Sequence, residues 1–173
     1  MLEKLIAIAQ SQVGVREIGG NNRGDQIREY QKATDLVPAA WPWCAAYIDW
    51  CIKEWLKDSQ VTKWLNLQRS TPEEWRPKTA LAYGLTAWAR KRPNTTKIFT
   101  EKDRAKLGDI VTFDFSHVGF VISDDGSSIQ VVEGNTNGRG DRDSLFGDGV
   151  WKKTRKKTLV KDLIRINPSI ASI

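Results

Sequence analysis

The chain has 173 residues, 40% of them hydrophobic and 28% charged, a composition typical of a folded globular protein rather than a disordered one. Its 27 Lys and Arg exceed its 21 Asp and Glu, so the formal net charge is +6, which favours an anionic partner such as nucleic acid, anionic lipid or acidic wall polymer. Two Cys and one His leave a usual four-ligand zinc site short of ligands.

The first third of the chain has the pattern of helices. Apolar residues at helical spacing predict an amphipathic helix over residues 2–13, which Gly14 ends, and a shorter helix over 25–34. A third, well-buried helix is predicted to begin near Cys44. Its apolar face carries Tyr47, Ile48, Cys51 and Trp55, whereas its opposite face carries Asp49, Lys53 and Lys57.

One more helical region precedes a change of pattern. Thr71-Pro72-Glu73-Glu74 is typical of a helix start, with a hydroxyl cap, a proline in the first turn and a glutamate three residues on. A helical stretch over 78–90 follows. No segment has the roughly 20 apolar residues of a membrane-spanning helix, so we expect no membrane insertion.

After Gly108 the apolar period becomes strand-like. Short β-branched or aromatic runs at 108–115, 117–123 and 128–134 predict three consecutive antiparallel strands. Two further strands are predicted within 150–166. Helices first and strands second indicate an α+β fold, with N-terminal helices packed on a C-terminal antiparallel sheet, and we expect one domain over residues 1–173.

One cysteine and the single histidine are candidates for nucleophilic catalysis. Cys44 is expected at the start of a helix, where unpaired N–H groups and the helix dipole favour a thiolate. A cysteine nucleophile needs an imidazole within hydrogen-bond reach, and His117 is the only one in the chain. Glu133 or Asn135, at the end of the next strand, could orient that imidazole, because neighbouring antiparallel strands place their ends close together.

The second cysteine is interpreted as a core residue. Cys44 and Cys51 are seven residues apart, so on one helix their Cα atoms lie about 10.5 Å apart. A disulfide needs a separation below about 7 Å, so this pair cannot close without breaking the helix.

Three sequence blocks together resemble a known family. PWCAAYIDWC, GDIVTFDFSHVGFV and VVEGN resemble the signature blocks of CHAP domains, which are cysteine amidases and peptidases related to the NlpC-type and papain-like folds. The resemblance implies Cys44 as nucleophile, His117 as general base and acid, Glu133 as the group that orients the imidazole, and Asn135 as a further polar site residue. The segment GNNRGDQ does not match the calcium loop of some members, so no metal or other cofactor is expected.

Other residues near these blocks have two interpretations each. Trp41 and Trp43 flank Cys44 and could line a substrate cleft or pack in the core. A basic run could attract anionic wall polymer, but a solvated edge strand is the simpler interpretation. That run consists of Lys152, Lys153, Arg155, Lys156 and Lys157.

The resemblance implies a peptidoglycan hydrolase that cleaves an N-acetylmuramoyl-L-alanine amide or a peptide bond, as phage endolysins do. The first residues lack a basic start and a long apolar core, so we expect no signal peptide. We also expect a monomer that is made in the bacterial host cytoplasm and acts at the cell wall after release. The alternatives are an antibacterial toxin of the same fold and a wall-binding module without activity. A nucleic-acid binder is not favoured, because only the net charge supports it.

Overall fold

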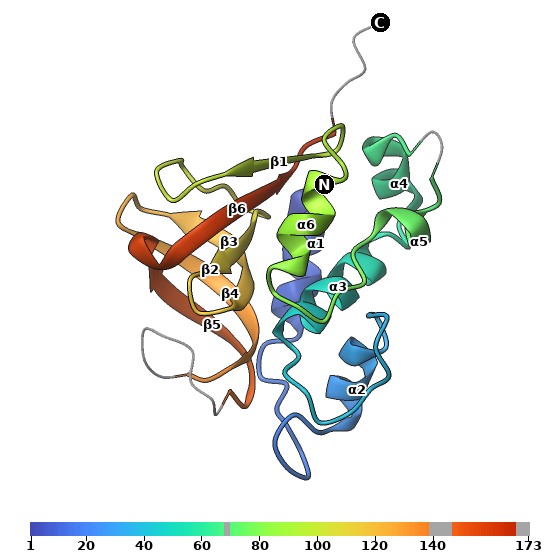
Figure 1. Cartoon of the computed structure of the whole chain (residues 1–173), viewed down its shortest axis with the longest axis vertical. Helices are drawn as coiled ribbons and strands as arrows, with labels where there is room; N and C mark the ends of the chain where they lie inside the picture. Colours follow the sequence, from blue (N-terminus) through green and yellow to red (C-terminus); the bar gives the residue numbers. More distant parts are fainter. Residues whose placement is uncertain (68–69, 139–146, 169–173) are drawn as a thin grey trace, which may run out of the picture.

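The computed structural model describes residues 1–67, 70–138 and 147–168. Within these ranges six α-helices precede six β-strands, which confirms the predicted α+β class (Figure 1). The helices are α1 (Leu2–Ser11), α2 (Asp25–Gln31), α3 (Cys44–Trp55), α4 (Ser59–Leu65), α5 (Pro72–Trp75) and α6 (Gly84–Arg90).

The strands form one antiparallel sheet in the order β1-β6-β2-β3-β4-β5. The predicted meander is its central part, since β2, β3 and β4 are neighbours, and β5 forms one edge. The strands are β1 (Thr96–Phe99), β2 (Ile110–Phe113), β3 (His117–Asp124), β4 (Ser128–Thr136), β5 (Gly149–Lys156) and β6 (Val160–Ile166). In Figure 1 the helices lie on one side of this sheet.

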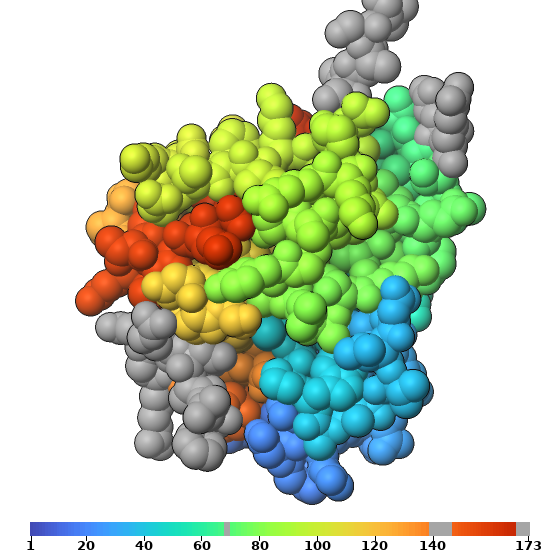
Figure 2. Space-filling model, in the orientation of Figure 1, coloured from blue at the N-terminus to red at the C-terminus, as the bar shows by residue number. Residues whose placement is uncertain are grey.

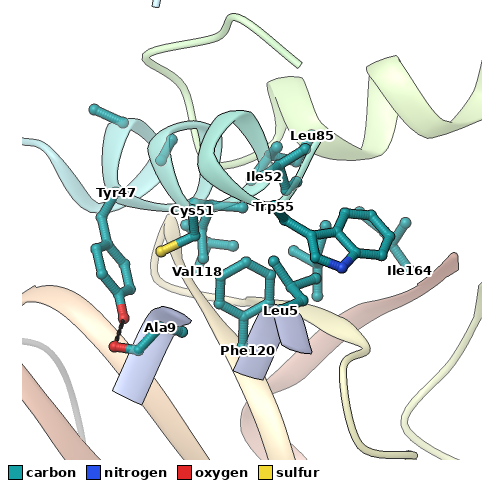
Figure 3. Close-up of a cluster of buried hydrophobic side chains, with 14 of the residues drawn as sticks. Leu5, Ala9, Tyr47, Cys51, Ile52, Trp55, Leu85, Val118, Phe120 and Ile164 are labelled. Atoms are coloured by element: carbon teal, nitrogen blue, oxygen red, sulfur yellow. Dashed lines mark hydrogen bonds between the residues drawn. The ribbon is translucent and has the colours of Figure 1, made fainter. Parts of the chain in front are cut away.

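The main core lies between α3 and the sheet. The apolar face of α3 packs against α1 and against side chains of β3, β4 and β6, and Cys51 is fully buried there, as predicted (Figure 3). The Tyr47 hydroxyl donates a hydrogen bond of 2.7 Å to the carbonyl of Ala9, which ties α3 to α1. Because α3 is fixed on both sides, its first residue has a defined position above the sheet.

The opposite face of the sheet carries a second, smaller apolar cluster. It includes Val111 and Phe113 of β2 and Val131 of β4. His117 pairs directly with Phe113, and Glu133 follows Val131 at the strand period, so both side chains lie on this second face. The candidate catalytic groups of the sheet therefore stand at the end of this smaller cluster.

The structure departs from the sequence predictions in three elements. Helix α6 begins at Gly84 rather than near residue 78, because the Thr79 hydroxyl accepts a hydrogen bond from the Leu81 N–H (3.1 Å) and holds the chain in a turn. Helix α4 and strand β1 had no prediction. None of the described helices is long and apolar enough to cross a membrane.

One residue of α3 that the helical spacing places on the solvent face is buried instead. Asp49 is fully buried, and its carboxylate oxygens have no hydrogen-bond partner of good geometry among the described residues, although the Thr79 backbone N–H acts on them. Burial, the largest cause, raises the pKa of this carboxyl well above its ordinary value of 3.8, although the charge of Arg76 opposes the shift. The connection that leads to α6 covers this side of α3, a long-range arrangement that helical spacing does not report.

Candidate active site

Cys44 is the first residue of α3, the position predicted for a nucleophile. It is 6% exposed, and the first α3 hydrogen bond runs from the N–H of Tyr47 to the carbonyl of Trp43. The N–H of Cys44 therefore precedes the helical bonding and remains available to a ligand. Both cysteines are free thiols.

A glycine on β4 brings this helix start close to the sheet. A Cβ atom at Gly134 would lie 2.7 Å from the Cβ of Tyr47 and 2.8 Å from the ring of Trp43. Any larger residue would push α3 away from β4. Gly134 directly follows Glu133, so the same strand carries the candidate carboxylate and makes room for the helix of the candidate nucleophile.

His117 and Glu133 meet as diagonal neighbours on β3 and β4. The Nε2 atom of His117 lies 2.8 Å from Oε2 of Glu133, and both side chains are buried. The register places Glu133 opposite Gly119, two residues beyond His117 on the same face. A Cβ at Gly119 would lie 2.7 Å from Cγ of Glu133, so the absence of a side chain there lets the carboxylate lean across to the imidazole.

The imidazole also interacts with Cys44. Burial alone lowers the pKa of His117, but the charge of Glu133 and hydrogen bonds with Cys44 and Glu133 outweigh burial and raise it to about 10. Because Nε2 is bonded to Glu133, Nδ1 is the nitrogen left to serve Cys44. The imidazole is thus bonded to the carboxylate on one side and acted on by the thiol of Cys44.

Glu133 has a second partner that the sequence analysis missed. Arg155 of β5 is fully buried, and its Nε and Nη2 atoms donate hydrogen bonds of 2.8 and 2.6 Å to the two carboxylate oxygens. Burial raises the pKa of Glu133, but the charge of His117 and the bonds from Arg155 lower it to about 2. The interpretation of the basic run as solvated is therefore wrong for Arg155, and also for Lys153, which is only 9% exposed.

A cavity of about 540 Å³ opens beside Cys44. Asn135 and Trp41 line it, as does Ser116 of the β2–β3 turn. Asn135 lies in a bulge where β4 pairs with β5, and its backbone has a φ of 54°. The bulge interrupts the regular alternation of side chains along β4 at this residue. In Figure 2 the light-green chain around residues 80–92 lies between the early helices, in blue, and the sheet, in yellow to red.

The two tryptophans next to Cys44 have different environments. Trp41 borders the cavity and donates a hydrogen bond to the carbonyl of Val37 (2.9 Å). Trp43 is fully buried, stacks on Tyr30 and donates a hydrogen bond of 2.8 Å to Glu17. The structure therefore supports the core interpretation for Trp43 and leaves the cleft interpretation to Trp41.

A helix-start cysteine in series with an imidazole and a carboxylate, on an α+β fold with an antiparallel sheet, has the layout of a cysteine-hydrolase site. The family model of the CHAP domain matches residues 37–135, which is more than half of the chain. The chain belongs to the CHAP domain family, and at family level this indicates a peptidoglycan hydrolase of the amidase or peptidase kind. No curated protein matches the chain.

The matched segment contains all the candidate site residues of the sequence analysis but ends before Arg155. The signal that could have marked Arg155 is its side-chain type, because the other four members of the basic run are lysines. Arginine is the residue suited to a buried two-point contact with a carboxylate. Among the described residues, no three His, Cys, Asp or Glu side chains gather as a metal site would require.

Proposed function

We propose that the protein hydrolyses an amide bond of bacterial peptidoglycan with Cys44 as nucleophile, His117 as general acid and base, and Glu133 as the group that orients the imidazole. The observation that carries the proposal is the 2.8 Å contact between the buried imidazole of His117 and Glu133, in a site where Cys44 begins α3 and acts on the imidazole pKa. A raised imidazole pKa favours a thiolate–imidazolium pair at neutral pH, which is the reactive form of such a site.

The reaction proceeds by acyl transfer in two steps. The Cys44 thiolate attacks the amide carbonyl, and the His117 imidazolium gives its proton to the leaving amine, which leaves a thioester on Cys44. His117 then takes a proton from water, the resulting hydroxide attacks the thioester, and the carboxylic acid product and the thiolate are released. The backbone N–H of Cys44 stabilises the oxyanion in both steps.

The cavity beside Cys44 supplies the substrate contacts in this proposal. Asn135 offers a side-chain amide to a peptide group or sugar hydroxyl, and Trp41 offers a flat apolar face. Trp43 is assigned to support of the helix start, since its side chain does not reach the surface.

The test compares two cysteine variants on purified cell walls. Cys44→Ala is expected to abolish the fall in turbidity while the far-UV circular dichroism spectrum stays unchanged. Cys51→Ala is the matched control, because it removes the other thiol without touching the site. Full activity of Cys44→Ala would refute the mechanism, and wall binding without hydrolysis by the wild type would favour the wall-binding alternative. Mass spectrometry of the digest identifies the bond from the new N-termini.

We extend the proposal to a phage endolysin made in the bacterial cytoplasm that reaches the wall after membrane release. Two free cysteines, one of them in the site, suit synthesis in a reducing compartment. Expression in bacteria with and without a membrane-permeabilising protein tests this role. Lysis that depends on permeabilisation is expected, and lysis without it would contradict the proposed release.

A further inference from the structure

Arg155 is held on two sides within the sheet. Its guanidinium makes two hydrogen bonds to Glu133, and its Cζ atom lies 5.4 Å from the ring centre of Phe113 and 5.2 Å from that of Phe115. The two phenylalanine rings are nearly parallel, and the Phe115 ring stacks on the His117 imidazole at 5.8 Å. The aromatic contacts and the carboxylate therefore fix the guanidinium and the imidazole in one packed unit.

Among the four groups of this site, Arg155 supplies the positive charge that balances the other three. The active form of the site holds a thiolate, an imidazolium and a carboxylate, which together carry one negative charge. A net charge is costly inside a protein, and the guanidinium neutralises it. Without Arg155 the buried groups would take up a proton, on the thiolate or on Glu133, and either event removes the reactive pair.

We propose that Arg155 is a positioning residue of the active site, which keeps Glu133 ionised and aimed at His117 so that the thiolate–imidazolium pair persists at lower pH. This inference rests on the proposed function and extends the site to a series of four groups. It assigns a role to a residue of β5, outside the segment that matches the family model.

Charged groups from α3, β3, β4 and β5 face one another in this unit. His117 and Arg155 act on Glu133, while Glu133 and Cys44 act on His117. Lys153, two residues before Arg155, is largely buried on the same face of β5. Of the residues that the structure describes, Arg155 is the one that makes the two-point contact with Glu133, so its removal is the specific perturbation.

The experiment measures the pH dependence of Cys44 alkylation by iodoacetamide in a Cys51→Ala background, together with kcat/KM on cell walls. Arg155→Met is expected to move the acid limb of both profiles upward by about one pH unit or more. Arg155→Lys restores the charge but not the two-point contact, so the limb should stay near that of the wild type while kcat falls. An unmoved limb in a folded Arg155→Met protein would overturn the proposal.

Arg165 provides a matched control on the same sheet. It makes an equivalent two-point contact with the buried carboxylate of Asp109 (2.9 and 2.7 Å) and packs on Phe99. Arg165→Met should lower stability and leave the acid limb unchanged. An equal shift of the limb in Arg165→Met would show that lost sheet packing, rather than the link to Glu133, moves the profile.

Two further results separate this inference from the proposed function. Arg155→Met should shift the acid limb less in a Glu133→Gln background than in the wild-type background, because part of its effect passes through Glu133; an equal shift in both backgrounds would refute this. Alkylation needs no substrate, so its profile tests Arg155 even if peptidoglycan is not cleaved. If Arg155→Met does not fold, Arg155→Lys decides, since an unchanged kcat there would refute the positioning role.

Discussion

Gly119→Ala should slow hydrolysis without unfolding the protein. The added Cβ would lie 2.7 Å from Cγ of Glu133, whereas ordinary contact begins at 3.4 Å, so the side chain must retreat by about 0.7 Å. A retreat along the bond to His117 would lengthen its 2.8 Å contact to about 3.5 Å, beyond the range of a hydrogen bond. We expect kcat/KM to fall about 10- to 100-fold, equivalent to about 1.4–2.7 kcal/mol of transition-state stabilisation.

The assay is the initial rate of turbidity loss of purified walls, with thermal unfolding measured in parallel. Gly138→Ala is the control, since no described residue lies within 4 Å of a Cβ at that position, just beyond the end of β4. It should keep the wild-type rate. A folded Gly119→Ala protein with the full rate would refute the idea that Glu133 must reach across Gly119 to orient His117.

Three other results are expected. Cys51→Ala should keep turnover but lower the free energy of unfolding by about 1–3 kcal/mol, because it leaves a small void in the core; lost turnover in a stable variant would contradict this. The only imidazole in the NMR spectrum should titrate near pH 10, whereas a midpoint near 6.5 would argue against its pairing with Glu133. Folded wild type holds the Asp49 proton more tightly than unfolded chain, so its stability falls as pH rises above about 3.8. Asp49→Asn should remove that fall and melt higher at pH 7, and a lower melting temperature would refute it.

Local patterns were enough to predict the parts of the fold that follow a single period. The helix that begins at Cys44 and the strands around His117 and Glu133 have clear apolar spacing, and the structure confirms these elements. Short elements without such spacing, such as β1, escaped prediction because four residues carry too little pattern. Thr79 illustrates a related limit, since one side-chain hydrogen bond shortened the predicted helix.

The site was predictable as far as residue types limited the choice. A single His left one candidate base, and the neighbouring strand ends suggested Glu133 or Asn135, of which the structure joins Glu133 to the imidazole. Arg155 and Asp49 were misjudged for a common reason. The spacing of apolar residues predicts which side chains share one face of a helix or strand. It does not predict whether another segment, distant in sequence, buries that face, as happens at both residues.

The order of the groups along the chain has a consequence for when activity can arise. Cys44 comes from the helical half, whereas His117 and Glu133 come from strands completed more than seventy residues later. Neither half holds both proposed reactants, so we expect a nascent polypeptide that lacks the strands to be inactive. Under the proposed mechanism, a cut in the connection between α6 and β1 should give two inactive fragments, and hydrolysis should return only if the fragments reassociate.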